Sequence, residues 1–310
     1  MKMIFFGLGS IGKRHAEILA ASPGHELFAY RSGEKARGND LGIKEVYSWE
    51  DVKKTGADIA FITNPTFLHT DTAIKCAELG MNLFIEKPVA ASAEKLALLI
   101  DTVDKKGLTA YVAYNLRFHP VIEYLKDHLA AKNVRHVSVY NASYLHGWRR
   151  GTDPLRSYSA SKEKGGGVIL DLSHEFDYIE YLFGKIETMD GVFAKAGDVT
   201  LDAEDFLDAV IKTEKTCVNL HLDFMSQHTE RSLKIDCADE FIFADLITSR
   251  IETHKDGKVA VKKYDSGTSE TYKKQLEYFL KNIGNRKIMN NLAEASGLFR
   301  KIIAFRNGKK

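Results

Sequence analysis

Residues 1–12 read MKMIFFGLGSIG, a short apolar run followed directly by a G-x-G-x-x-G turn. Each glycine of such a turn has its own role. Gly7 makes the tight turn off the strand, Gly9 lets the backbone approach a pyrophosphate, and Gly12 lets the next helix pack closely. That helix is expected over residues 11–21, and its N-terminus, near Ser10 and Ile11, offers N–H groups and a positive dipole end to phosphates. The order of strand, glycine turn and helix therefore favours a dinucleotide-binding unit over an ordinary strand–helix turn.

The composition and charge of the 310-residue chain exclude several classes of protein. The length suits two domains, and 44% hydrophobic with 28% charged residues is typical of a soluble globular protein. A formal net charge of +2 is too small to favour nucleic acid or an anionic membrane surface as a partner. No apolar run approaches the length of a membrane span, and the apolar N-terminal stretch breaks at Gly7, too early for a secretory signal.

The cysteines Cys76, Cys217 and Cys237 lie far apart and form no CxxC pair. An odd number of separated cysteines indicates reduced thiols rather than a disulfide or zinc framework. We therefore expect a cytoplasmic protein that binds no metal.

The first third of the chain alternates apolar strands with helical segments. Strands are expected at residues 3–6, 26–30, 45–47, 58–63, 82–85 and 109–113, with helices that include residues 70–79 and 93–106. Strands that are apolar on both faces and separated by helices predict a parallel sheet covered on both sides.

The pattern changes after about Pro120. A helix over residues 121–131, a strand over 134–144, a polar loop and a helical run over 168–183 precede a strand-rich stretch, 188–263, with a hairpin signal at Asp256-Gly257. Helices over residues 270–282 and 292–305 follow. The expected fold class is α/β, with a Rossmann domain over residues 1–118 and a C-terminal α+β domain over residues 119–310. The sheet of the second domain should be mostly antiparallel and open on one face.

The end of the second expected strand carries a cation where NAD-specific domains place an acid. Arg31 lies 24 residues after Gly7, followed by Ser32. A cation at this position favours the 2′-phosphate of NADP over the 2′-hydroxyl of NAD, because a guanidinium binds phosphate bidentately. We expect Arg31 and Ser32 to select NADP, with NAD possible; a solvated loop arginine is the alternative.

Polar residues follow the fourth and fifth strands of the expected parallel sheet: Thr63-Asn64-Pro65 and Glu86-Lys87-Pro88. Open α/β sheets bind ligands at these carboxyl ends. A lysine there could donate to a reacting hydroxyl or carbonyl. Judged by position alone, Lys87 fits this role and the role of a surface lysine at a turn equally well.

The helical run after three glycines concentrates polar residues. On a continuous helix, Asp171, His174 and Asp177 or Tyr178 share a face. A histidine with a carboxylate one turn away can act as a general acid/base pair. From the spacing alone a hydrogen-bonded structural histidine is the favoured interpretation, and Asp171 with His174 supplies too few ligands for a metal.

The preceding loop, residues 146–158, mixes aromatic, guanidinium and hydroxyl groups. Such a mixture suits stacking on a sugar or holding an anionic substituent, and a solvent loop or a dimer contact is the alternative. The candidate substrate contacts are Trp148, Arg149, Arg156 and Tyr158.

Several motifs, taken together, resemble the Gfo/Idh/MocA (glucose-fructose oxidoreductase/inositol dehydrogenase) family. They occur in the order of the family and span nearly the whole chain: residues 7–12, Thr63-Asn64-Pro65, Glu86-Lys87-Pro88, Tyr114-Asn115-x-Arg117-Phe118 and residues 165–178. The resemblance implies hydride transfer between a nicotinamide and a carbon of a sugar, sugar acid, cyclitol or nucleotide sugar. It also implies an open C-terminal sheet that mediates a homodimer or tetramer.

The resemblance assigns roles to particular residues. It implies that Lys87 is the catalytic lysine, that His174 is the acid/base histidine, and that Asp171 orients His174 or the sugar. Many members place the aspartate four residues before the histidine, whereas Asp171 lies three before His174. The remaining implied contacts are Thr63, Asn64, Pro65, His69, Glu86 and Asn115 for the cofactor and Arg117 for the substrate.

Other functions remain possible on the same fold. One is a non-enzymatic NADP-binding regulator, which an intact Lys87 and His174 disfavour. Another is a lyase or hydrolase that oxidises and re-reduces its substrate on a resident cofactor, with the same hydride-transfer residues.

Overall fold

A computed structural model of the chain describes residues 1–33, 38–145, 161–162, 165–197, 202–265 and 268–308. The described residues divide into two compact units. The first unit comprises Met1–Tyr114 and Tyr272–Arg300, and the second comprises Asn115–Thr271 and Lys301–Lys310.

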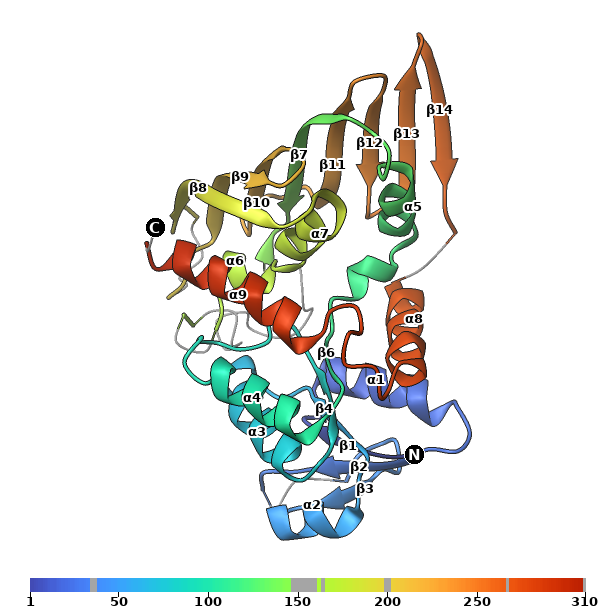
Figure 1. The fold of residues 1–310 in the computed structure, drawn as a ribbon, viewed down its shortest axis with the longest axis vertical. Coiled ribbons are helices and arrows are strands. Elements are labelled where there is room, and N and C mark those ends of the chain that lie inside the picture. Colours follow the sequence, from blue (N-terminus) through green and yellow to red (C-terminus); the bar gives the residue numbers. More distant parts are fainter. Residues whose placement is uncertain (34–37, 146–160, 163–164, 198–201, 266–267, 309–310) are drawn as a thin grey trace. The chain divides into compact units, whose positions relative to one another are not determined.

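The described part of the first unit contains a six-stranded sheet in which all neighbouring strands are parallel (Figure 1). The strand order β3-β2-β1-β4-β5-β6 is that of a dinucleotide-binding Rossmann fold, which confirms the predicted fold class of this part. Its elements are β1 (Lys2–Phe6), α1 (Ser10–Ala20), β2 (Glu26–Tyr30), β3 (Lys44–Val46), α2 (Trp49–Thr55), β4 (Ile59–Ile62), η1 (Thr66–Leu68), α3 (His69–Glu78), β5 (Asn82–Ile85), α4 (Leu96–Lys106) and β6 (Ala110–Val112).

A cluster of aromatic rings forms the core of the first unit. Phe61 stacks on Phe5 at 4.7 Å and lies 4.9 Å from Phe84, between ring centroids. The Phe279 ring, from helix α8 (Thr268–Lys281), lies 5.4 Å from that of Phe84 and is fully buried. This packing explains why residues 272–300 group with the first unit, whereas the predicted second domain, residues 119–310, includes them.

The described part of the second unit contains an eight-stranded sheet in the order β14-β13-β12-β11-β7-β10-β9-β8. Neighbouring strands are antiparallel except β7 and β10, so the predicted mostly antiparallel sheet is confirmed. Its strands are β7 (Val134–Ala142), β8 (Ile186–Ala194), β9 (Phe206–Thr213), β10 (Cys217–Asp223), β11 (Glu230–Cys237), β12 (Phe241–Asp245), β13 (Arg250–Lys255) and β14 (Lys258–Lys263). The helical elements are η2 (Asn115–Phe118), α5 (Pro120–His128), α6 (Val168–Asp171), α7 (His174–Phe183) and α9 (Leu292–Arg306), whose first residues belong to the first unit.

The predicted hairpin at Asp256-Gly257 joins β13 and β14 at the edge of this sheet (Figure 1). Both residues have positive φ, 50° and 69°, as a tight two-residue hairpin turn requires. Within the described ranges, no helix combines the length and hydropathy that crossing a bilayer requires.

Candidate active site

The glycine turn between β1 and α1 has the geometry that its spacing predicts. Gly7 adopts φ +111°, and a Cβ there would lie 2.7 Å from the backbone N of Asn64. A Cβ on Gly12 would lie 2.1 Å from the carbonyl oxygen of Gly7. Gly9 differs, because a Cβ there would meet no atom within 4 Å. The fold itself thus requires Gly7 and Gly12, while the exposed backbone at Gly9 and Ser10, at the N-terminus of α1, leaves the approach that a pyrophosphate needs.

A cavity of about 510 Å³ lies beside this turn, at the carboxyl ends of β1, β2 and β4. This is where an open parallel sheet binds ligands. Of the predicted cofactor residues, Gly7, Arg31, Ser32, Asn64 and Pro65 line it, together with Phe6, Leu8, Tyr30, Trp49, Leu68, Asp71, Thr72 and Lys75.

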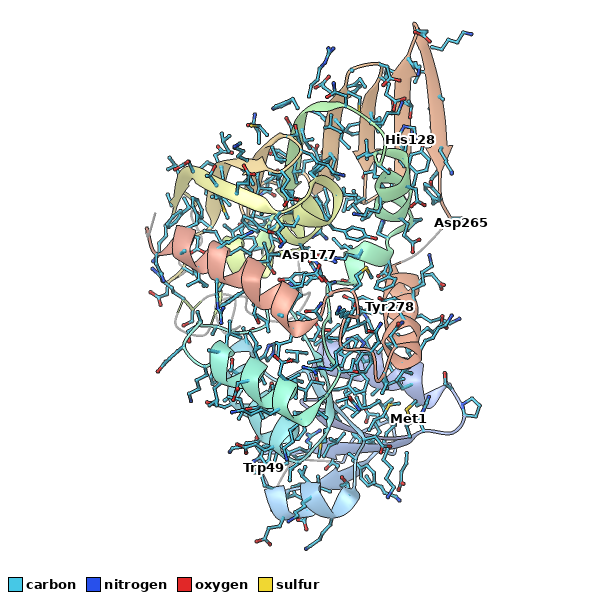
Figure 2. The ribbon with its side chains drawn as sticks, in the orientation of Figure 1. Met1, Trp49, His128, Asp177, Asp265 and Tyr278 are labelled. Carbon is cyan, nitrogen blue, oxygen red and sulfur yellow. The ribbon has the colours of Figure 1, made fainter. Side chains whose placement is uncertain are left out.

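Trp49 and Lys75 are cavity residues that no sequence motif indicated. Trp49, the first residue of α2 (Figure 2), stacks on Phe6 at 5.1 Å, and the Lys75 ammonium lies 5.1 Å from the Trp49 ring centroid. No motif spacing links the two positions, so only the packing of α2 and α3 against the sheet brings them together.

The Arg31 side chain lines the cavity and forms an ion pair with a carboxylate. Its Nη1 lies 3.5 Å from Oε1 of Glu45, and its side chain is about a quarter exposed. The pKa of Glu45 is lowered, chiefly by the hydrogen bond that the Tyr47 hydroxyl donates and then by that of Asn39. The arginine expected to bind a 2′-phosphate is therefore paired with a carboxylate that remains ionised.

The turn after β4 is bonded to the glycine turn. The Thr63 hydroxyl donates to the carbonyl oxygen of Gly7 at 2.6 Å, and the Asn64 side-chain amide donates to the Thr72 hydroxyl at 2.9 Å. Thr63 is buried, so its role is to hold the backbone, whereas Asn64 and Pro65 also line the cavity.

Residues 86–88, which we call the Lys87 turn, follow β5. Oε1 of Glu86 lies 2.7 Å from Nε2 of His15, and Oε2 accepts the backbone N–H of Lys87 at 3.2 Å. His69 places Nδ1 3.0 Å from the Pro88 carbonyl oxygen and Nε2 2.8 Å from that of Asn64. His69 is 2% exposed, and burial lowers its pKa. The ring of His69, expected to contact the cofactor, is buried between the backbone carbonyl oxygens of Asn64 and Pro88.

The segment that carries His174 differs from the expected single helix. The helical run is interrupted at Leu172 and Ser173, so Asp171 ends α6 and His174 begins α7. Leu172 has φ −97° and ψ 32°, outside the helical region, which stops the first helix. The expectation of one continuous helix over residues 168–183 is therefore wrong. His174 is partly exposed while residues 175–179 are buried, and Lys87 is likewise partly exposed between buried neighbours.

Arg117 occupies a buried ion pair. Its Nε donates to Oδ2 of Asp177 at 2.9 Å and its Nη2 to Oδ1 at 2.8 Å, with both side chains at most 3% exposed. Asp177 lies on α7, three residues after His174 (Figure 2). The Tyr181 ring lies 4.7 Å from the guanidinium. Arg117, expected to bind substrate, thus has the contacts of a residue that anchors α7.

A second buried pair anchors the start of α6. Arg306 donates from Nη2 to Glu204 at 2.7 Å and to the carbonyl oxygen of Gly166 at 2.7 Å. Gly167 has φ +106°, and a Cβ there would lie 2.5 Å from Oε1 of Glu204. The glycines before α6 are therefore needed for close packing against this pair.

The remaining predicted site residues fall into two groups. Asn115, expected near the cofactor, is buried and donates to the Thr271 hydroxyl at 2.7 Å. The predicted substrate contacts Trp148, Arg149, Arg156 and Tyr158 lie outside the described residues. Among the residues that are described, no group of three or more His, Cys, Asp or Glu could hold a metal ion.

Comparison with protein families agrees with this architecture. Residues 1–114 match the family described as "Oxidoreductase family, NAD-binding Rossmann fold", and residues 122–242 match the GFO/IDH/MocA C-terminal domain. The two matches together cover most of the chain.

Curated relatives include dehydrogenases and a hydratase. The chain is 31% identical over 188 residues to scyllo-inositol 2-dehydrogenase (NAD(+)) of Bacillus subtilis (strain 168), covering 57% of this chain and 52% of the relative. It is 26% identical over 213 residues to 2,7-anhydro-N-acetylneuraminate hydratase of Mediterraneibacter gnavus, covering 65% and 55%. The chain spans about half the length of these relatives.

Solved structures share the fold over nearly the whole chain. A levoglucosan dehydrogenase in complex with NADH has a TM-score of 0.86 at 17% identity, covering 100% of this chain and 96% of that one. UDP-N-acetylglucosamine 3-dehydrogenase GnnA from Acidithiobacillus ferrooxidans has a TM-score of 0.80 at 20% identity, covering 99% and 97%. From its family matches, its Rossmann sheet and its antiparallel second sheet, the chain belongs to the Gfo/Idh/MocA family of oxidoreductases.

Proposed function

We propose that this chain is an NAD(P)-dependent oxidoreductase that transfers a hydride between a nicotinamide and a carbon of a sugar, sugar acid, cyclitol or nucleotide sugar. The observation that carries the proposal is the glycine turn, whose Gly7 and Leu8 line the 510 Å³ cavity at the strand ends and whose Gly9 has open space around it. The names of several relatives, for inositol, levoglucosan and UDP-N-acetylglucosamine, support a polyhydroxylated substrate.

The proposed chemistry divides between two partly exposed residues. The nicotinamide, when bound, accepts a hydride during oxidation and donates one during reduction. His174 removes the proton from the substrate hydroxyl, and Lys87 donates a hydrogen bond to the same oxygen and stabilises its developing negative charge. Asp171 orients His174 or the sugar. We keep Trp148, Arg149, Arg156 and Tyr158 as proposed substrate contacts.

Turnover of a panel of sugars and nucleotide sugars, followed by NAD(P)H absorbance, tests these roles. His174→Ala should lower kcat by about 10²–10⁴-fold while leaving cofactor binding intact, because positioned proton transfer contributes that much, and Lys87→Met should lower kcat at least as much. Lys105→Met and His228→Gln, at exposed positions, are the matched controls. Near-normal turnover in either site variant would show that the residue does not carry its step.

The cofactor preference is a separate proposal. Arg31 and Ser32 favour NADP, although Glu45 offsets part of the Arg31 charge. Arg31→Ala should weaken NADPH binding by about one to two orders of magnitude, since a hydrogen bond to a charged group contributes about 1.5–3 kcal/mol, and should change NADH binding little. Glu45→Gln should strengthen NADPH binding. Equal affinity of the unmodified protein for NADH and NADPH would contradict the preference.

A second candidate function is a reaction with no net redox change. Two of the relatives are 2,7-anhydro-N-acetylneuraminate hydratases, from Mediterraneibacter gnavus and Escherichia coli. The same residues would then oxidise and re-reduce one substrate. Product formation from a sugar-acid substrate without change in NAD(P)H would favour this reaction over that of a dehydrogenase.

We also propose that the open face of the second sheet binds another copy of this chain. Val192 and Val210, on neighbouring strands, are 66% and 54% exposed on this face. The face also holds a hollow of about 550 Å³ that includes Tyr140 stacked on His221. Sedimentation should give a dimer or tetramer that Val210→Glu dissociates, and a monomer at micromolar concentration would contradict the proposal.

The cytoplasmic location stays a prediction. Cys76, Cys217 and Cys237 all fall within the described residues and are unpaired, and burial raises the pKa of the Cys76 and Cys237 thiols. Unpaired thiols are typical of a reducing compartment.

A further inference from the structure

We propose that His15 and His69 are positioning residues that hold the Lys87 turn from two sides, through Glu86 and through Pro88. The inference rests on the proposed function only for the role of Lys87 in the reaction. Both histidines lie in the first unit, at 0% and 2% exposure, so neither ring can touch a ligand from solvent.

His15 acts on the turn through a carboxylate. Its Nε2 lies 2.7 Å from Oε1 of Glu86, and Oε2 of Glu86 accepts the backbone N–H of Lys87 at 3.2 Å. The ring of Phe84 packs against the imidazole at 5.0 Å, edge to face. Because the chain supplies no hydrogen-bond partner for Nδ1 among its described residues, Nε2–H is the natural donor to Glu86.

His69 acts on the residue after Lys87. Its Nδ1 lies 3.0 Å from the carbonyl oxygen of Pro88, and its Nε2 lies 2.8 Å from that of Asn64. Carbonyl oxygens only accept, so each contact needs its own N–H, and a neutral imidazole, which carries one N–H, donates to only one of the two carbonyls. With its N–H on Nδ1, the neutral ring donates to Pro88 and holds the Lys87 turn, while its Nε2 faces the carbonyl oxygen of Asn64, a residue that lines the cofactor cavity.

Together the two contacts fix the backbone on both sides of Lys87. Its own N–H is bound to a carboxylate that His15 holds, and the next residue's carbonyl is bound by His69. A lysine side chain is long and flexible, so its amine is placed reproducibly only when its Cα is. The geometry thus assigns the histidines to positioning rather than to proton transfer.

Substituting each histidine by asparagine or by glutamine tests the contacts of its two ring nitrogens one at a time. Glutamine places its amide near Nε2 and asparagine near Nδ1, so His15→Gln should keep the contact to Glu86 and His15→Asn should lose it. At His69 the expected effects of the two substitutions are reversed. His69→Asn should keep the contact to Pro88, and His69→Gln should keep only the contact to Asn64. A general loss of stability cannot produce this crossed pattern.

The experiment measures hydrogen exchange of a peptide spanning residues 86–89 in the full-length protein, together with the binding of NADPH and of 2′,5′-ADP. His15→Asn and His69→Gln should raise exchange at the Lys87 turn by about five- to tenfold, the effect of losing one hydrogen bond. They should weaken NADPH by a similar factor and leave 2′,5′-ADP, which lacks the nicotinamide half, within about twofold. His15→Gln, His69→Asn and the control His228→Gln should stay close to the unmodified protein.

The outcomes distinguish this inference from the proposed function. Equal exchange in the asparagine and glutamine variants at both positions would overturn the positioning roles, whatever the activity. The crossed exchange pattern with unchanged NADPH binding would support the positioning roles and overturn instead the placement of Lys87 at the nicotinamide.

Discussion

The Lys87 turn in the first unit and the α6–α7 segment in the second are held by different chemistry. Imidazoles, one carboxylate and backbone groups hold the Lys87 turn. Buried arginine–carboxylate pairs hold the other segment: Arg306 with Glu204 at the start of α6, and Arg117 with Asp177 on α7. Each segment carries one of the two residues, Lys87 and His174, that are proposed to act on the reacting oxygen.

The difference has a physical consequence. A guanidinium stays charged at every pH that a protein meets, whereas an imidazole changes charge near neutrality. Breaking a buried ion pair leaves a charge without compensation, whereas losing a hydrogen bond that a neutral imidazole donates costs less. We therefore expect the second segment to be sensitive to substitution and the first to be sensitive to pH.

The largest expected effect is on the Arg117–Asp177 pair. Arg117→Met should lower the free energy of unfolding by about 3–5 kcal/mol, because it leaves the Asp177 carboxylate buried and uncompensated. Urea unfolding measures the loss. Arg250→Met, which breaks an ion pair with Glu252 in which the arginine side chain is 42% exposed, is the control and should change stability by about 0–1 kcal/mol.

A second variant shows whether the charge is the cause. Arg117→Met combined with Asp177→Leu should recover most of the lost stability, since replacing both partners removes the unpaired charge. A double variant as unstable as Arg117→Met would attribute the effect to lost packing against Tyr181 instead.

An intermediate effect is expected on the pH dependence of stability in the first unit. Burial lowers the pKa of His69 below its ordinary 6.5, so the unfolded chain binds a proton there that the folded protein does not. The free energy of unfolding should therefore fall as pH drops below about 6.5, by at most about 1.4 kcal/mol per pH unit for this one group. His69→Asn, which does not titrate, should flatten the slope, and His228→Asn should not. Identical slopes for His69→Asn and the unmodified protein would contradict the expectation.

The smallest effect is expected at an exposed ion-pair cluster of the second unit. Lys255 and Lys132 donate to Asp239 and hold its pKa at about 2. Its contribution to stability is present above pH 3.8, the ordinary value, and is lost as pH falls towards 2. Asp239→Asn should slightly shift the acid unfolding midpoint at low salt and have no effect at high salt, because exposed charges are screened. An equal shift of the acid unfolding midpoint at high salt would contradict the expectation that this cluster, unlike the Arg117–Asp177 pair, is screened by solvent ions.

The sequence by itself determined the features whose causes are local. The apolar run before Gly7, the positive φ of Gly7, the close contact of Gly12 with Gly7 and the hairpin at Asp256-Gly257 depend on neighbours a few residues away, and all have the expected geometry. The alternation of apolar strands and helices was enough for the parallel sheet of the first unit, because period and length are local properties.

The tertiary structure alone decided how the site residues are supported. His15 meets Glu86 across 71 positions of sequence, and Arg306 meets Glu204 across 102. It likewise decided that Phe279 completes the core of the first unit and that the helical run breaks after Asp171. No local pattern encodes these pairings, because they arise only when strands and helices far apart in sequence pack together and buried polar groups must find partners there.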